Sequence, residues 1–239
     1  MDKKNYYLTL ALSVVFLISS CQKVIYGTGS YETETRAIGT VKAIHSTGKF
    51  DITLHRDTIN SIRIYAEAGI LPYIVTELKP DGTLVLRYRD YNVNYKHKKI
   101  EIYVPVNGVS AIDLQGSGSV KAHGITYNQN VNLNIGGSGT INLTLNAFNV
   151  ATNISGSGKI DLEGLVQNAK HVISGSGNLY AFTLLSDSTN TNISGSGRME
   201  VNAQNYLKVN ISGSGNVIYK GLPTLETTIS GSGKVIKSN

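Results

Sequence analysis

Residues 152–160 read TNISGSGKI, and this short unit decides the fold because variants of it recur along the second half of the chain. The triplet Gly-Ser-Gly occurs seven times, and successive copies begin 18 to 21 residues apart. The triplets begin at Gly116, Gly137, Gly156, Gly175, Gly195, Gly213 and Gly231. Self-similarity at a nearly constant step of this length is typical of repeat architectures in which each copy forms one structural unit.

Apolar residues occupy fixed positions on both sides of each triplet. Two residues before the first glycine stand Leu114, Ile135, Ile154, Ile173, Ile193, Ile211 and Ile229; four residues after it stand Val120, Ile141, Ile160, Leu179, Met199, Val217 and Val235. These positions alternate with polar ones, which is the period of a β-strand with one buried face. Each copy therefore predicts a strand, a Gly-Ser-Gly corner and a second strand.

One such unit cannot bury its own apolar face, but stacked units, spaced about 4.8 Å apart, share a continuous core. Glycine at the corners is consistent with a positive φ or with a backbone approach that a Cβ would obstruct. The sequence therefore predicts an all-β protein built as a parallel β-helix or solenoid. We expect a right-handed coil because parallel crossovers strongly favour that hand.

A polar column lies three residues before each triplet. Its members are Asp113, Asn134, Asn153, Val172, Asn192, Asn210 and Thr228. Such side chains can form ladders that hydrogen-bond from one unit to the next. Alternatively, Asn134, Asn153, Asn192 and Asn210 form a binding stripe that contacts carbohydrate. His171 falls in an inward column with Thr152 and Thr191, and we interpret it as a local exception rather than a site.

The first residues have the layout of a secretory signal. Residues 1–20 combine a charged start with an apolar stretch that is too short to span a membrane, and they end in Ile18-Ser19-Ser20 before Cys21. This ending resembles a lipobox, and Cys21 is the only cysteine of the chain. We therefore expect residues 1–20 to be a lipoprotein signal peptide and Cys21 to carry the lipid.

The remaining chain divides into three expected parts. Residues 21–37, with Gly27 and Gly29, are expected to form a tether, and residues 113–239 the Gly-Ser-Gly solenoid. Residues 38–112 contain strand signals without the clear repeat, so they form either a second β module or irregular first turns that cap the solenoid. The last turn has no distinct cap in the sequence; Lys234 and Lys237 supply charges that can protect its edge, and homo-association through this open turn is the alternative.

Charge and chemistry exclude several classes of function. The net charge of +6 falls to +5 without the signal peptide and is spread thinly, apart from Lys96, Lys98 and Lys99 with Arg87 and Arg89 nearby. We interpret that cluster as a solvated loop near the membrane, and not as a nucleic-acid site. The five histidines show no ligand spacing, so neither a metal nor a cofactor is expected.

Catalysis on a β-helix would need clustered carboxylates on one face. The acids of the repeats lie at different offsets in different units; they are Asp113, Asp161, Glu163, Asp187, Glu200 and Glu226. A non-catalytic protein is therefore the main expectation. An envelope carbohydrate-active enzyme, a lyase or hydrolase, is the alternative.

The sequence resembles the head GIN domain family of auto-transporter adhesins. The resemblance rests on FDITL at 50–54, GTLVL at 82–86, IYVP at 102–105 and the serial Gly-Ser-Gly units, and it spans about residues 38–238. It implies an adhesin and supplies no catalytic motif. Together with Cys21, it predicts a lipid-anchored adhesin or binding scaffold of the cell envelope. We expect an outer-membrane lipoprotein that faces the periplasm or the surface and binds a glycan or a protein.

Overall fold

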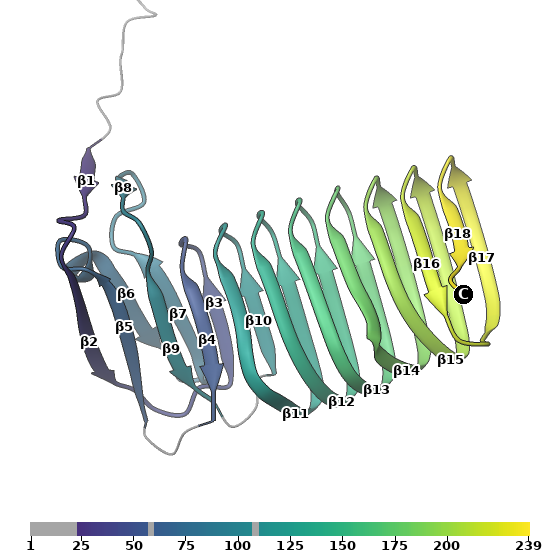
Figure 1. Ribbon diagram of the computed structural model, residues 1–239, viewed down its shortest axis with the longest axis horizontal. Helices are drawn as coiled ribbons and strands as arrows, with labels where there is room; N and C mark the ends of the chain where they lie inside the picture. The colour runs from purple at the N-terminus through teal and green to yellow at the C-terminus, as the bar shows by residue number, and fades with distance from the viewer. Residues whose placement is uncertain (1–22, 57–59, 107–109) are drawn as a thin grey trace, which may run out of the picture.

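The computed structural model describes residues 23–56, 60–106 and 110–239. Within these ranges the chain is almost entirely β-strand, with one short 3₁₀ helix, η2 (Leu71–Tyr73), and no α-helix. The strands form an elongated stack of coils (Figure 1). The expected signal peptide and its Cys21 lie outside the described residues.

The repeat region forms a parallel β-solenoid, as predicted. Its long strands are β11 (Ser119–Ile135), β12 (Thr140–Ile154), β13 (Lys159–Ile173), β14 (Asn178–Gly195) and β15 (Arg198–Gly213). Each bends partway along its length, so that one strand makes most of one turn (Figure 1). The last turns are shared among β16 (Asn216–Lys220), β17 (Thr224–Gly231) and β18 (Lys234–Lys237).

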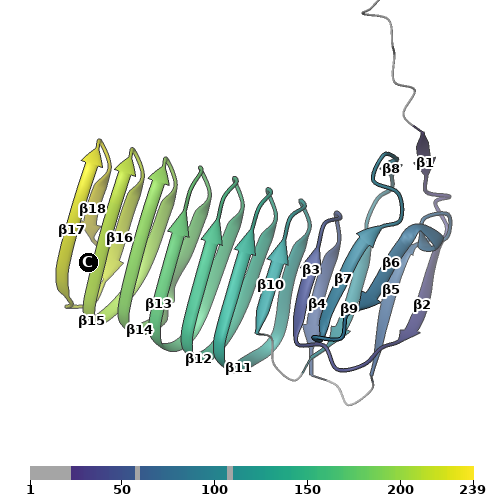
Figure 2. The same ribbon diagram turned by 180° about the vertical axis from the view of Figure 1, so that it is seen from behind.

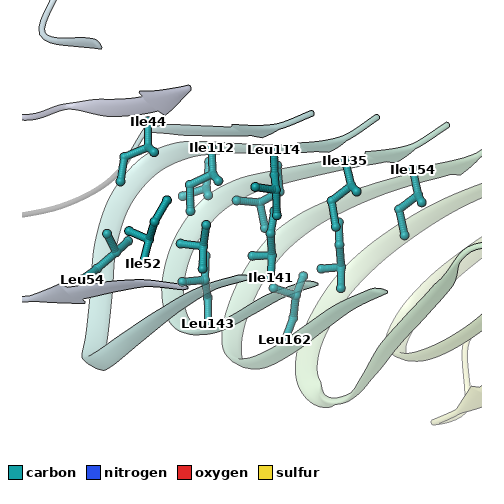
Figure 3. Close-up of a cluster of buried hydrophobic side chains, with 14 of the residues drawn as sticks. Ile44, Ile52, Leu54, Ile112, Leu114, Ile135, Ile141, Leu143, Ile154 and Leu162 are labelled. Atoms are coloured by element: carbon teal, nitrogen blue, oxygen red, sulfur yellow. The ribbon is translucent and has the colours of Figure 1, made fainter. Parts of the chain in front are cut away.

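The register of these strands stacks the predicted apolar columns. Ile135 pairs with Ile154, and the column continues through Ile173, Ile193 and Ile211. These five side chains are at most 2% exposed. Figure 3 shows part of the column pointing into the coil opposite Ile141, Leu143 and Leu162. Full burial of each aliphatic side chain contributes about 1.5–3 kcal/mol, so the columns supply the main stabilisation.

The corners require glycine because neighbouring turns approach closely there. A Cβ added to Gly213 would lie 2.6 Å from Gly195 O, and one added to Gly215 would lie 2.5 Å from Ile193 Cγ2. Among the first glycines of the triplets, only Gly195, Gly213 and Gly231 have a left-handed φ. Close approach is therefore the cause that the corners share, and backbone conformation adds to it at the later turns.

Backbone hydrogen bonds run through the corners as well as along the strands. Ser157 N–H donates to Gly137 O at 3.2 Å, and Ser176 N–H donates to Gly156 O at the same distance. The chain can therefore reverse direction at these corners without leaving these backbone groups unpaired.

The amino-terminal portion continues the solenoid in a different order from the sequence. β10 (Ala111–Leu114) pairs with β3 (Ala43–Ser46), and β3 pairs with β7 (Thr83–Tyr88). On the other side, β11 pairs with β4 (Asp51–His55), and β4 pairs with β9 (Glu101–Pro105). The turn made by β3 and β4 thus lies between the β7–β9 turn and the repeats, although it comes first in the chain (Figure 2).

Antiparallel strands close this end of the stack. β5 (Ser61–Glu67) pairs with β9 and with β2 (Tyr31–Ala37), while β6 (Ile74–Leu78) pairs with β7. β1 (Val24–Tyr26) pairs separately with β8 (Asn94–Lys96). β1 and β2 fall inside residues 21–37, where the sequence suggested a tether, so much of that segment is hydrogen-bonded to the folded body.

The opposite end exposes its last turn. Every residue of β17 is solvent-exposed, including Leu225 at 41% and Ile229 at 44%. Leu225 pairs in register with Leu207, and Ile229 pairs with Ile211; both partners are buried in the preceding turn. Within the described residues, no further strand pairs with the outer side of β17.

Candidate binding face

The two long faces of the solenoid differ in chemistry. The face formed by the strand segments that precede each corner, here called the amide face, carries outward columns that are three, five and seven residues before the triplets. Its asparagines are Asn130, Asn132, Asn134, Asn149, Asn153, Asn168, Asn190, Asn192 and Asn210. Because the register aligns these columns, amides in adjacent turns lie ~4.8 Å apart and amides two residues apart on a strand ~6.7 Å apart, although Val172, Ala151 and Lys170 interrupt the columns.

The four asparagines predicted as a binding stripe lie on this face. Asn134 pairs in register with Asn153, and Asn192 pairs with Asn210, while Val172 stands between the two pairs. Asn153 and Asn192 are exposed, and the other two are half-buried. In the described part of the chain, no side-chain hydrogen bond joins these four amides to one another.

A second asparagine column, which the sequence analysis did not single out, forms the internal ladder. Asn149 Nδ2 donates to Asn130 Oδ1 at 2.7 Å, and Asn168 Nδ2 donates to Asn149 Oδ1 at 3.0 Å. The signal was available in the sequence, because all three residues stand seven positions before a triplet. This column therefore forms a hydrogen-bonded ladder between turns, whereas the four asparagines of the predicted stripe are half-buried or exposed.

A groove with apolar side chains continues the amide face toward the bend of the strands. Phe148, Leu165 and Leu185 are 49%, 55% and 40% exposed, and Leu165 pairs in register with Leu185. Polar side chains surround them; the groove is lined by Asn128, Gln129, Asn146, Gln167 and Asp187 among others and has a volume of about 820 Å³. That volume is within the range of small-molecule sites, although the groove is open to solvent.

His171 belongs to the core and not to the surface. It is 1% exposed, and its Nδ1 lies 2.9 Å from Thr152 Oγ1 in the neighbouring turn. Burial lowers the pKa of His171 to about 4, because the apolar interior disfavours the charged imidazolium. The residue is therefore neutral at physiological pH, and it occupies the inward column with Thr152 and Thr191.

Four of the six acids of the repeats contact nearby basic groups. His45 Nδ1 lies 2.7 Å from Asp113 Oδ2, and Arg198 Nη2 lies 2.7 Å from Glu200 Oε1. Lys159 pairs with Asp161 at 3.3 Å, and Lys208 pairs with Glu226. Among the described residues, no three His, Cys, Asp or Glu side chains gather in a geometry that could hold a metal ion.

The face is therefore rich in groups that both donate and accept hydrogen bonds, with a few charged side chains such as Lys170, Lys208 and Glu226 among them. Fold and surface together define a β-solenoid with a polar side face. Residues 41–223 match the family described as "Putative auto-transporter adhesin, head GIN domain", and the chain belongs to this family. This confirms the family that the sequence resembled.

Solved structures share the fold over nearly the whole chain. A "putative adhesin" from Bacteroides fragilis is 23% identical with a TM-score of 0.83, and covers 90% of this chain and 100% of its own. A "putative lipid binding protein" from Parabacteroides distasonis is 25% identical with a TM-score of 0.76, and covers 91% and 100%. A third, a "putative adhesin" from Parabacteroides merdae, is 21% identical with a TM-score of 0.73, and covers 91% and 100%. No curated protein matches the sequence.

Adhesins are typical of the cell envelope or the cell surface, so membership of this family indicates a cell-envelope or surface protein. Across the described ranges, no helix has the length and apolarity needed to cross a membrane.

Proposed function

We propose that this protein is a lipid-anchored, non-catalytic adhesin or binding scaffold of the bacterial cell envelope, and that its amide face binds a neutral glycan. The observation that carries the proposal is the set of nine asparagines in the outward columns of one face. The family's description as an adhesin supports the class of function.

The chemistry of the face suits a polyhydroxylated ligand. An asparagine side chain offers two donors and one acceptor oxygen, so it can bond to a hydroxyl in either sense. The apolar side chains of the adjoining groove, Phe148 above all, offer a surface on which the C–H face of a sugar ring can pack. Because asparagines stand in several turns of the face, successive units of a polymer can meet similar groups.

The state of the acids supports binding over catalysis. A glycoside hydrolase uses two carboxyl groups that flank the scissile bond. Asp187 is the acid that lines the groove, and Asp161, Glu200 and Glu226 each have a basic partner elsewhere. The proposal therefore assigns no catalytic residue.

A binding experiment with the soluble chain from Gln22 tests the amide face. We expect binding to envelope or host glycans on an array, and we expect the double variant Asn153→Ala/Asn192→Ala to weaken it at least fivefold. The matched control is Asn142→Ala/Asn178→Ala, which removes two amides from the opposite face. Equal binding by the two variants, or no binding to any glycan, would refute the assignment, and release of cleaved sugar would favour the enzyme.

The lipid anchor is tested separately on the full chain in a Gram-negative host. Cys21 would accept a diacylglyceryl group, and the protein would then sediment with outer membranes. We expect metabolic labelling with a radioactive fatty acid to mark the wild-type protein and not Cys21→Ser. Labelling that survives this substitution would contradict the anchor.

A further inference from the structure

A projection near the amino terminus differs from the rest of the solenoid edge. The corner between β7 and β9 is enlarged into a loop of residues 89–99 that contains β8, and β1 runs parallel to β8 (Figures 1 and 2). Asn94 N–H donates to Lys23 O at 2.9 Å, and Gly27 N–H donates to Lys96 O at 2.8 Å. The chain that leads away from Cys21 is thus bonded directly to this loop. Residues 23–26 and 89–99 are here called the projection.

One buried carboxylate ties the projection to the body. Glu67 is 4% exposed, and its two oxygens accept the backbone N–H groups of Gly29 at 2.9 Å and Lys98 at 3.0 Å. The bond from the Lys98 amide is the main cause that lowers the pKa of Glu67. The carboxylate therefore stays ionised at neutral pH and holds both strands of the projection at their bases.

Stacked aromatic rings support the loop from within. The rings of Tyr88 and Tyr95 stack with centroids 4.4 Å apart, and Tyr88 also packs on Phe50 at 4.9 Å. Tyr88 Oη lies 2.6 Å from His97 Nε2. The hydrogen bond and the ring contacts thus connect the enlarged corner to the folded body.

The outer surface of the projection combines cations with tyrosine. Lys23, Arg89, Lys96 and Lys98 are exposed, and Tyr26 and Tyr91 are 63% and 74% exposed. Lys96 Nζ lies 5.6 Å from the centre of the Tyr26 ring. Within residues 87–99 there are five Lys and Arg residues and one acid, Asp90, which bonds to Tyr95 Oη. Tyrosine beside lysine and arginine is the composition of protein surfaces at a membrane interface.

We propose that the projection lies against the membrane and that its cations bind anionic lipid headgroups. The proposal rests on the lipid anchor proposed above, because the three residues from Cys21 to Val24 reach at most about 10 Å. A lipid at Cys21 therefore brings β1 and β8 to the bilayer surface. The headgroup contacts then add an electrostatic attachment to the one that the diacylglyceryl group supplies.

Vesicle sedimentation with the unlipidated chain from Gln22 tests the site independently of the anchor. We expect binding to phosphatidylcholine vesicles that contain phosphatidylglycerol, weaker binding at high salt, and none to phosphatidylcholine alone. Each lysine removed lowers the affinity about fivefold, so Lys96→Gln/Lys98→Gln is expected to lower it by more than an order of magnitude. The control Lys121→Gln/Lys170→Gln makes the same charge change on the solenoid faces and is expected to bind as the wild type does.

Three results would overturn the proposal: no binding to the anionic vesicles, an equal loss in the control variant, or displacement by inorganic phosphate at millimolar concentration, which would indicate a site for the free anion. Failure of the anchor is recognised separately. In that case Cys21→Ser keeps its membrane association in cells while the vesicle results are unchanged, and the projection alone accounts for the attachment.

Discussion

Replacing Gly197 with alanine should destabilise the solenoid through a clash between two turns. A Cβ at this position would lie 2.6 Å from Ile173 Cγ2 and 2.7 Å from Gly177 O, whereas carbon contacts are comfortable at about 3.5–4.0 Å. φ at Gly197 is not in the left-handed region, so the effect isolates packing from backbone strain. The turns must separate by a fraction of an ångström, which strains the 3.2 Å bond from Arg198 N–H to Gly177 O.

The expected cost follows from two opposing terms. Overpacking a well-packed interior destabilises by about 1–3 kcal/mol. Alanine also restricts the unfolded chain, which returns about 0.4–1 kcal/mol. The net loss in the free energy of unfolding is therefore about 1–2 kcal/mol, and with a urea m-value near 2 kcal/mol/M the midpoint falls by about 0.5–1 M.

Urea denaturation of the soluble chain, followed by circular dichroism, measures this shift. Ser196→Ala is the matched control because Ser196 is the exposed centre of the same triplet, and a surface change of this kind stays within about 0.5 kcal/mol. A Gly197→Ala midpoint equal to that of Ser196→Ala would refute the reasoning, since the corner would then have room for a Cβ.

Three further predictions concern other parts of the chain. His171 has a pKa of about 4 when folded and about 6.5 when unfolded, so the free energy of unfolding is highest above pH 6.5 and falls by about 3 kcal/mol as the pH drops to 4. His171→Thr should flatten this part of a curve of stability against pH. An unchanged slope would contradict the buried, neutral state of His171. Glu67→Gln should speed hydrogen exchange at the backbone amides of Gly29 and Lys98, which donate to the carboxylate, while exchange in the repeats stays as in the wild type. Unchanged protection at both amides would show that the carboxylate does not hold these segments. The exposed Leu225 and Ile229 should favour association of two copies through the last turn. Leu225→Lys/Ile229→Lys should therefore abolish concentration-dependent dimers in sedimentation velocity. A wild-type chain that stays monomeric at high concentration would contradict this prediction.

In the amino-terminal half, the sequence predicted the strands but not their order in the stack. The strands around Ile52 and Leu84 were evident from alternation, and both side chains are fully buried. Their order in the stack was not evident, because β3 and β4 pair with strands that follow them by 40 to 68 residues. Register between distant strands depends on which apolar columns align, and a local pattern carries no information on that choice.

The amide face shows the same limit at the level of side chains. The column of Asn153 and Asn192 could be read from the triplets, but the ladder from Asn130 to Asn168 could be confirmed only from bonded distances. The exposed apolar groups of the groove, such as Phe148, also stand at positions where the strand bends, and the alternating pattern predicts their orientation poorly there.

The amino-acid sequence by itself determined the repeating coil, its aliphatic interior and the need for glycine at each corner, because these follow from short-range periodicity repeated many times. The tertiary structure alone decided the order of the first turns and the union of β1 with β8. It also decided which amides face solvent and which bond to one another. Those features depend on contacts between residues far apart in the chain, where small differences in packing and hydrogen bonding select one arrangement among several that the local pattern allows.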